Sequence, residues 1–369
     1  MIRHNPENER IKHAYLGFLR EALGRDPAAL DAVAMALHRF ETFTGYLDFR
    51  TFDREQAGEF KAYLTSLSSA RSGSPLSAAT IAATLRILKA FFSWLADQTN
   101  YRGKIRASDC QFLNPNANNA RIASARRPSR APALEDIRRV IMAMPSGSDI
   151  EKRDRALIAG AIISGARLAA LASLKLKHLD LNARTIFQDA REVRTKARKT
   201  FESCFMPVGD DIREIIESYV GFLRTERGFG DGDPLFPKTA MRSDPLAGFV
   251  PDGLSREHWI SGGPIRSIFR EAFARAGVHY ANPHSFRNTI VKRAYDMRLG
   301  LEELKALSQS LGHKSLVTTV SSYGEVPHHR EVEIMRALAE RKPVEPTEEI
   351  EGALRKLLAQ IEASRAAQQ

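Results

Sequence analysis

The sequence predicts a mainly α fold with a small antiparallel β-sheet, divided between two domains. Domains usually hold about 100–200 residues, so a chain of 369 residues is expected to form two of them. Hydrophobic residues make up 43% of the chain, which is enough for two cores. Apolar residues recur at helical spacing through most of the sequence, whereas only two short segments have the character of strands.

The N-terminal part, residues 1–113, is expected to be a bundle of three or four short amphipathic helices. Between Ile11 and Thr99 the apolar residues fall on helical faces. Pro75 and the serines around it mark the start of the last of these helices. The apolar residues of that helix lie on one side: Ile81, Leu85, Leu88, Phe92 and Leu95.

Residues 114–133 have no apolar period and are expected to be a linker. This segment is rich in Asn, Pro, Ala and Ser, and it carries four arginines, namely Arg121, Arg126, Arg127 and Arg130. Such a segment is either an ordinary solvated tether or a basic tether whose arginines meet phosphates.

Residues 134–330 are expected to form the second domain, with a helical tail over residues 331–369. The apolar stretch Ala156–Leu174 is interpreted as a buried core helix interrupted at Gly165, because a charge at Arg167 would be costly in a membrane. Two strands are predicted, at RTIFQDA (184–190) and SCFMPV (203–208). Between Gly228 and Gly263 the density of Gly, Pro and Asp predicts loops.

The charge balance favours a polyanionic partner. There are 55 Lys and Arg residues against 44 Asp and Glu, which gives a net charge of +11 and a pI near 9.7. The simplest such partner is nucleic acid, although charge alone is equally consistent with a basic protein that has none. Two distant cysteines and a polar N-terminus agree with a reducing, cytoplasmic location and no membrane association.

Several kinds of site are not predicted. The histidines do not have the HExxH spacing, and Cys110 and Cys204 belong to no metal-binding cluster, so no metal is expected. Phosphate-binding and dinucleotide-binding glycine motifs are also missing from the sequence, and we therefore expect no nucleotide cofactor.

A series of cations and hydrogen-bond donors precedes a single tyrosine near the end of the second domain. Arg167 lies in apolar surroundings, where an arginine is costly unless it has a partner. His284 and Arg287 are three residues apart and would share a helical face. Lys199 falls between the two predicted strands, where a hairpin turn would project it, although Lys196 and Arg198 are close competitors for the same role. The series ends with His313 and Tyr323.

In this order the segments resemble the boxes of the tyrosine recombinases, the phage integrase family of site-specific DNA recombinases. SGARLAALASLKL resembles the first arginine box, KTFESCFMPV the lysine hairpin, HSFRNT the His-x-x-Arg box, and SLGHKSLVTTVSSYGEV the box with the nucleophilic tyrosine. The likeness covers about Leu134 to Pro327. The helical N-terminal part and the basic linker would then correspond to a core-binding domain.

The resemblance implies strand cleavage and rejoining through a 3′-phosphotyrosine at Tyr323, without ATP or metal. It assigns the leaving-group proton to Lys199 and a phosphate hydrogen bond to His313. Arginine forks suit phosphate oxygens, so Arg167 and Arg287 would hold the scissile group, and His284 is a candidate base or orienter. The preceding helix would hold His313, and the short Ser/Gly segment would let Tyr323 swing.

The implied partners are double-stranded DNA with a specific recombination site, a homotetramer on that DNA, and an accessory DNA-bending protein. Arg266 and Arg270 face either DNA or solvent, and the C-terminal tail packs either on a neighbouring subunit or on its own core.

Two departures from the family pattern leave alternatives open. Ala170 occupies the position of an acid, and Asn288 stands where a second histidine is common. A catalytically weakened DNA-binding relative that acts as a regulator therefore remains an alternative. A type IB topoisomerase, which relaxes supercoils by the same chemistry, is another.

Overall fold

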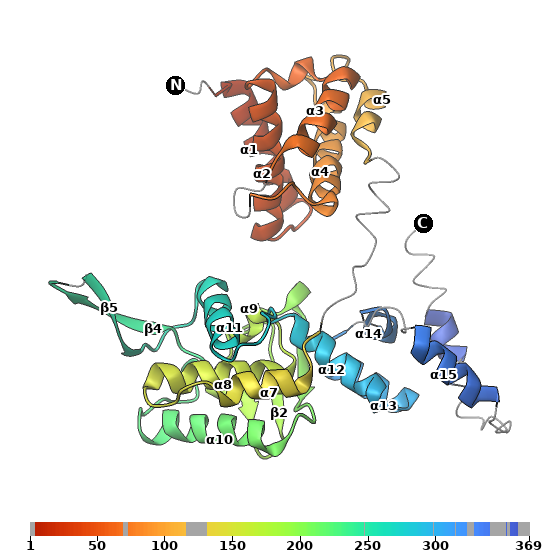
Figure 1. The fold of residues 1–369 in the computed structure, drawn as a ribbon. Coiled ribbons are helices and arrows are strands. Elements are labelled where there is room, and N and C mark those ends of the chain that lie inside the picture. The colour runs from red at the N-terminus through yellow and green to blue at the C-terminus, as the bar shows by residue number, and fades with distance from the viewer. Residues whose placement is uncertain are drawn as a thin grey trace. The chain divides into compact units, whose positions relative to one another are not determined.

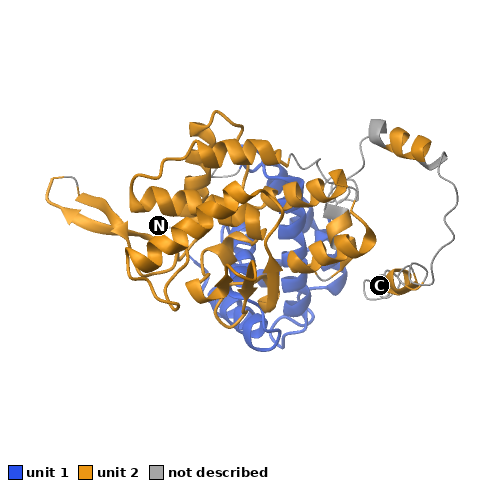
Figure 2. Ribbon diagram, turned by 90° about the horizontal axis from the view of Figure 1, so that it is seen from below, with its two compact units in different colours: residues 1–127 blue, residues 128–369 orange. Residues whose placement is uncertain are grey.

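Helices dominate both of the units into which the chain divides, residues 1–127 and residues 128–369 (Figures 1 and 2). The structure is a computed structural model. It describes residues 4–68, 73–115, 131–246, 248–297, 299–313, 315–322, 328–339, 352 and 355–360.

Unit 1 consists of helices alone among its described residues. They are α1 (Pro6–Glu21), α2 (Pro27–Thr44), a 3-10 turn (Phe49–Thr51), α3 (Arg54–Ser66), α4 (Ala78–Ala96), α5 (Ala107–Cys110) and a 3-10 turn (Gln111–Leu113). Short polar side chains start several of them. Asp26 accepts a hydrogen bond from the main chain of Ala29 at the start of α2, and Ser77 accepts one from Thr80 at the start of α4.

Aromatic rings form the centre of unit 1. Phe52 and Phe92 stack with ring centroids 3.8 Å apart, and Phe40 meets both rings edge to face. By length and composition α4 is apolar enough to cross a membrane, but Leu88 and Leu95 on its inner face are fully buried in this core. The predicted apolar side of α4 is therefore confirmed as a core face.

Unit 2 combines helices with short strands. Its first half contains α7 (Leu134–Met142), α8 (Asp149–Ser164), α9 (Leu168–Leu171), a 3-10 turn (Leu176–His178), β1 (Leu179–Asp180), β2 (Thr185–Gln188), a 3-10 turn (Lys196–Arg198), β3 (Phe201–Cys204) and α10 (Asp210–Thr225). Its second half contains β4 (Thr239–Asp244), β5 (Gly248–Leu254), α11 (Gly263–Arg275), α12 (Ser285–Asp296), α13 (Leu301–Ser310), α14 (Leu316–Ser322) and α15 (His328–Ala339).

The long apolar segment of unit 2 is a buried core helix, as predicted. Ser148 and Glu151 form a reciprocal capping box at the start of α8. The helix ends at Gly165, whose φ of 56° is in the left-handed region. A Cβ at that position would lie 2.6 Å from Leu311 Cδ2, so both the backbone conformation and the packing require glycine.

The two predicted strands are confirmed, with a third strand beside them. β1, β2 and β3 form an antiparallel sheet in that order, in which Ile186 pairs with both Leu179 and Ser203. The loop between β2 and β3 contains Lys199. The predicted hairpin in this region is therefore present.

The prediction of loops between Gly228 and Gly263 was wrong in part, because β4 and β5 form a second antiparallel hairpin there. This hairpin projects from the rest of unit 2 (Figure 1). Its apolar residues are exposed, Leu246 by 99% and Phe249 by 77%, so it lacks the alternating buried positions that mark a strand in a sequence. Its base is held by the buried Arg153, which donates to Pro237 O at 2.5 Å and to Thr239 Oγ1 at 3.1 Å.

Candidate active site

Arg287 joins three segments of unit 2 that are far apart in sequence. It lies in the first turn of α12 and is 5% exposed. Its guanidinium donates to the main-chain oxygen of Gly165, to that of Leu311 at 2.6 Å, and to Nε2 of His313 at 2.8 Å. Since Gly165 is two residues before Arg167, these bonds bring the Arg167 segment and the His313 segment to the same place.

The turn Leu311–Gly312–His313 packs closely against β3, the strand that follows the Lys199 loop. Gly312 has a φ of 65°, and a Cβ on it would lie 2.5 Å from the ring of Phe201 in β3. Two residues before Gly312, at the end of α13, the carbonyl of Ser310 accepts a hydrogen bond from Ser203 Oγ at 2.8 Å. The main-chain N–H of Cys204 donates to Ser310 Oγ at 2.7 Å. The end of α13 and strand β3 are thus fixed to each other.

His313 lies just beyond the end of α13 and not on it, which corrects the expectation that the preceding helix holds it. A guanidinium has no acceptor, so Nε2 must accept from Arg287 and the neutral ring carries its proton on Nδ1. Nδ1 lies 2.6 Å from Thr319 Oγ1, and Thr319 in turn donates to Ser308 Oγ at 2.8 Å. Both ring nitrogens have protein partners, so a phosphate hydrogen bond from His313 requires Arg287 to leave Nε2.

Positive charges surround His313 from several sides. Burial first, and then the charges of Arg287, Arg167, Lys199 and His284 in that order, lower the pKa of His313 from 6.5 to about 4. Five of the six predicted catalytic residues, all except Tyr323, are thus close enough to act on one another's charges, and we refer to these five as the cluster.

The cluster lowers the pKa of its own members. Burial first, and then the charge of Arg167, lowers the pKa of Arg287 to about 9. Burial also lowers the pKa of Arg167, and burial together with Arg287 lowers that of His284. None of these effects comes from a carboxylate. The side chain of Arg167 makes no hydrogen bond or ion pair with any residue that the structure describes.

Buried cations are stable only when an anion or several acceptors compensate them. Elsewhere in unit 2, Arg153 has Asp154 at 2.6 Å. In the cluster, carbonyl oxygens and a neutral imidazole are the partners observed for Arg287. The arrangement is suited to an external anion with several oxygens, and guanidinium groups match a phosphate well.

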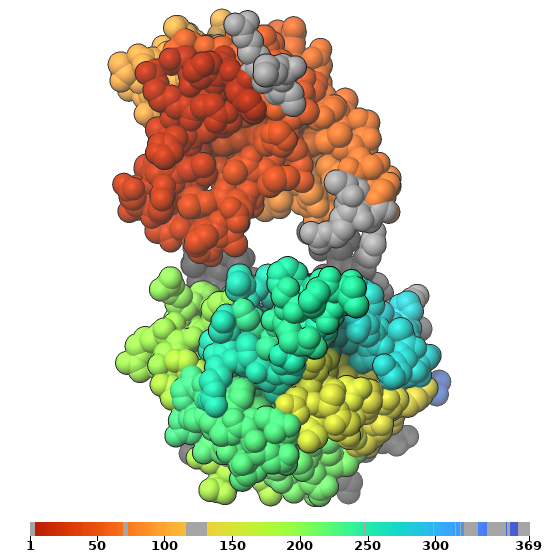
Figure 3. Space-filling view, turned by 90° about the vertical axis from the view of Figure 1, so that its left-hand side faces the viewer, coloured from red at the N-terminus to blue at the C-terminus, as the bar shows by residue number. Residues whose placement is uncertain are grey.

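The remaining predicted residues are of two kinds, those that the structure does not describe and two arginines on α11. Tyr323 and the linker arginines Arg121, Arg126, Arg127 and Arg130 lie outside the described residues. Arg266 and Arg270 lie exposed on α11, which forms part of the surface of unit 2 (Figure 3). The segment before Tyr323 is helix α14 up to Ser322. The rest of the short Ser/Gly segment, which was expected to let Tyr323 swing, lies outside the described residues. In the described part of the chain, no three His, Cys, Asp or Glu residues are grouped as a metal site would require.

Sequence reasoning missed several residues that hold the cluster in place. Thr319 and Ser308 fix the tautomer of His313. The only sequence signal for this role was the pair Thr318–Thr319 shortly after the histidine. Ala170, at the position of the missing acid, is 1% exposed and packs in the core. Ser173, one helical turn further on, donates to the main-chain oxygens of Ala169 and Ala170 at 2.9 and 3.1 Å.

Comparison with known proteins agrees with this architecture. The model of the phage integrase family matches residues 134–329, more than half of the 369-residue chain. The chain therefore belongs to the phage integrase family.

Curated relatives are tyrosine recombinases. XerC of Pseudomonas aeruginosa is 25% identical over 222 residues, which are 59% of this chain and 62% of that protein. The match thus spans less than two thirds of that relative's length. XerC of Thermodesulfovibrio yellowstonii is 27% identical over 259 residues, 69% of this chain and 74% of that protein.

Two solved structures share the fold. A lambda integrase fragment (residues 75–356), a dimer bound to a COC′ core site, has a TM-score of 0.57 at 13% identity and covers 92% of this chain and 99% of its own. XerH recombinase bound to a palindromic difH substrate has a TM-score of 0.56 at 15% identity and covers 90% and 84%. The predicted fold class, mainly α with small antiparallel sheets in a two-domain recombinase architecture, is confirmed.

Proposed function

We propose that this protein is a site-specific DNA recombinase that breaks and rejoins DNA strands through a 3′-phosphotyrosine at Tyr323. The observation that carries the proposal is the cluster of Arg167, Lys199, His284, Arg287 and His313, which interact with one another's charges without a carboxylate among them. Attack at a phosphodiester concentrates negative charge on the non-bridging oxygens. Preorganised cationic donors around those oxygens are the strongest means of stabilising such a transition state.

Cleavage forms one bond and breaks one. The phenol oxygen of Tyr323 bonds to phosphorus as the bond from phosphorus to the DNA O5′ breaks. His284 is the candidate to accept the phenol proton, and the lowered pKa of its ring keeps it neutral for that task. Lys199 supplies a proton to O5′, which leaves as a hydroxyl. Because the phosphotyrosine conserves the phosphodiester's energy, neither ATP nor a metal is required for a second strand's 5′ hydroxyl to attack and rejoin.

The rest of the chain is assigned to holding DNA. We assign residues 1–113 to a helical core-binding domain, residues 114–133 to a basic linker, residues 134–330 to the catalytic domain and residues 331–369 to a tail that packs on a neighbouring subunit. Arg121, Arg126, Arg127, Arg130, Arg266 and Arg270 would contact phosphates. The two structural neighbours are named as complexes with DNA, which supports double-stranded recombination sites as the partner of this protein. The proposal further includes a cytoplasmic location and a tetramer on those sites, with or without an accessory DNA-bending protein.

The test is covalent capture of DNA. The protein first selects its binding site from a random-sequence pool, and a labelled duplex carrying that site, nicked next to the scissile phosphate, then traps the adduct. Wild-type protein should give a DNA-linked band in denaturing gels, and Tyr323→Phe should give none. The control is Tyr280→Phe, at an exposed tyrosine between α11 and α12, which should form as much adduct as wild type. Equal adduct from Tyr323→Phe and wild type would refute the assignment.

Ala170 supports a second candidate, a weakened relative that binds DNA and regulates. It predicts salt-sensitive DNA binding with no adduct on any duplex. A topoisomerase would instead relax a supercoiled plasmid that lacks the selected site, and a relaxation assay separates it from a recombinase.

A further inference from the structure

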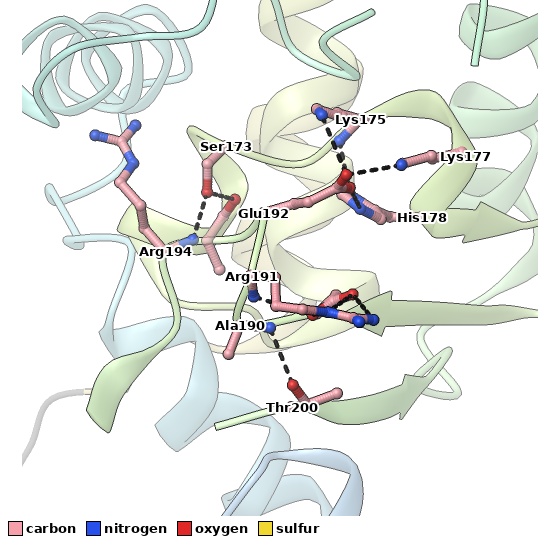
Figure 4. A network of polar contacts seen from close by, with 11 residues as sticks. Ser173, Lys175, Lys177, His178, Ala190, Arg191, Glu192, Arg194 and Thr200 are labelled. Atoms are coloured by element: carbon pink, nitrogen blue, oxygen red, sulfur yellow. Dashed lines mark hydrogen bonds and ion pairs between the residues drawn. The ribbon is translucent and has the colours of Figure 1, made fainter. Parts of the chain in front are cut away.

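The loop that carries Lys199, residues 189–200, is tied to the rest of unit 2 mainly at its first half (Figure 4). Val193 is buried in the core, and Glu192 meets the buried His178 at 2.9 Å. At the other end, Thr200 Oγ1 accepts from the main chain of Ala190 at 3.1 Å and closes the loop above the sheet. Lys199 therefore sits between a firmly held segment and the start of β3.

Arg194 connects this loop to two other segments of unit 2, and Figure 4 shows the first of these connections, which is to Ser173. Its main-chain N–H donates to Ser173 Oγ at 2.9 Å. Its guanidinium donates to three main-chain oxygens, those of Ala172 at 3.2 Å, Trp259 at 2.5 Å and Ile260 at 3.0 Å. A single side chain thus ties the lysine loop to the segment after α9 and to the segment before α11.

Ser173 completes this tie from the other side. Its hydroxyl donates toward the carbonyls of Ala169 and Ala170 in the last turn of α9, so its lone pairs point to the Arg194 N–H. Helix α9 begins directly after Arg167. The Ser173–Arg194 tie therefore links the segment of the first phosphate-binding arginine to the loop of the proton donor, next to the position where Ala170 stands in place of an acid.

We propose that Arg194, together with Ser173, is a positioning residue that sets where the Lys199 ammonium stands relative to the DNA leaving oxygen. This inference rests on the proposed function and deepens it. Proton transfer requires the donor within about 2.6–3.2 Å of the acceptor, and a misplacement of about 1 Å can reduce the rate about 100-fold. Two of the three carbonyl oxygens bonded to Arg194 belong to Trp259 and Ile260. Loss of the guanidinium would therefore release the loop from the segment before α11.

A duplex with sulfur in place of the bridging O5′ separates positioning of a proton donor from general damage. In the sulfur duplex the bond from phosphorus to sulfur breaks and a thiolate leaves. A thiol ionises near pH 8.5, far more readily than an alcohol, so the thiolate leaves without a proton from the enzyme. A variant that lacks only proton donation should therefore be slow on the oxygen duplex and close to wild type on the sulfur duplex.

The experiment measures single-turnover adduct formation on both duplexes, each carrying the site selected by the protein. Lys199→Ala should lose about 10²-fold or more on the oxygen duplex and recover on the sulfur duplex. Arg194→Ala should show the same pattern with a loss of about 10–100-fold, and Ser173→Ala a smaller loss that Ser173→Thr restores. The matched control is Arg191→Ala, an 85% exposed arginine of the same loop that pairs with Asp189. Its rate of adduct formation should stay within about 3-fold of the wild-type rate on both duplexes.

The outcomes distinguish this inference from the proposed function. If wild type forms no adduct on either duplex, or if Lys199→Ala does not recover with sulfur, the proposed chemistry fails and the positioning role fails with it. If Lys199→Ala recovers but Arg194→Ala and Ser173→Ala lose equally on both duplexes or lose nothing, the chemistry stands and the positioning role is wrong. Ser173→Ala removes one hydroxyl, so it also provides the answer if Arg194→Ala does not fold.

Discussion

A buried charged pair in unit 1 and the cation cluster of unit 2 are stabilised in different ways. In unit 1, Glu41 is 1% exposed and meets the ammonium of Lys12 at 2.6 Å. Burial alone would lower the pKa of Lys12, but its hydrogen bonds to Glu41 and Glu9 outweigh burial and raise it. In unit 2, Arg287 has no carboxylate partner among the described residues, and its pKa falls to about 9.

The difference separates a structural charge from a functional one. The two charges of an ion pair neutralise each other and leave no charge for a ligand, as Lys12 and Glu41 do in unit 1. The positive charges of Arg287 and Arg167 repel each other, which raises the free energy of burying them. The carbonyl oxygens bonded to Arg287 offset only part of this free energy. Binding of an anion would reduce this repulsion, so the cluster in the free protein is already arranged to bind phosphate.

The largest expected effect is at Arg287, which has no carboxylate partner among the described residues. Arg287→Lys keeps the charge, but one ammonium cannot reach Gly165, Leu311 and His313 together or grip a phosphate with two parallel bonds. We expect adduct formation to fall about 10²–10³-fold, as when one preorganised donor is lost. Single-turnover cleavage with the selected duplex measures it. A loss below 10-fold would mean that charge alone, without the fork, is sufficient.

The paired charge of unit 1 should affect stability and not cleavage chemistry. Lys12→Met leaves Glu41 buried without its cation and should cost about 3 kcal/mol. The double variant Lys12→Met/Glu41→Leu should recover most of that loss. The chain has two tryptophans, and Trp94 is in unit 1, so urea unfolding in a Trp259→Phe background reports this unit. No recovery in the double variant would contradict the ion-pair explanation.

The cluster also predicts a pH dependence. The folded pKa of His313 is about 4 and the unfolded value about 6.5, so between these values the unfolded chain binds more protons. The stability of unit 2 therefore falls as pH decreases from about 6.5 to about 4, by up to about 3 kcal/mol from this residue. Urea unfolding followed by Trp259 in a Trp94→Phe background measures it. His313→Gln should flatten the slope, and an unchanged slope would show that other groups cause it.

The smallest expected effect concerns the hydroxyl that fixes the His313 tautomer. Thr319 is fully buried, and Thr319→Val leaves Nδ1–H without an acceptor, which should cost about 1–2 kcal/mol. Thr319→Ser keeps the hydroxyl and should retain most of the stability. If the tautomer matters, Thr319→Val also shifts the pH profile of cleavage while Thr319→Ser does not. Matching profiles for both variants would limit Thr319 to packing.

Much of the site was predictable because its residues lie in short local patterns. Apolar spacing located α4 and α8, the glycine after the apolar run located the end of α8, and two short strand-like segments located β2 and β3. The β4–β5 hairpin was missed because its apolar residues face outward, so no buried alternation marks it. Thr319, Ser173 and Arg194 were missed because their roles arise from contacts with segments distant along the chain.

The identity of the chemical groups, their order and the helices that carry them could be predicted without coordinates, because residue type and apolar period are local properties. The bonds from Arg287 to the carbonyls of Gly165 and Leu311, which bring mutually repelling cations together, became visible in the folded chain alone. Close packing and hydrogen bonds between distant segments overcome this repulsion, and no local pattern records them. The two glycines at 165 and 312 are readable in the sequence, but the contacts that require them exist only in the fold.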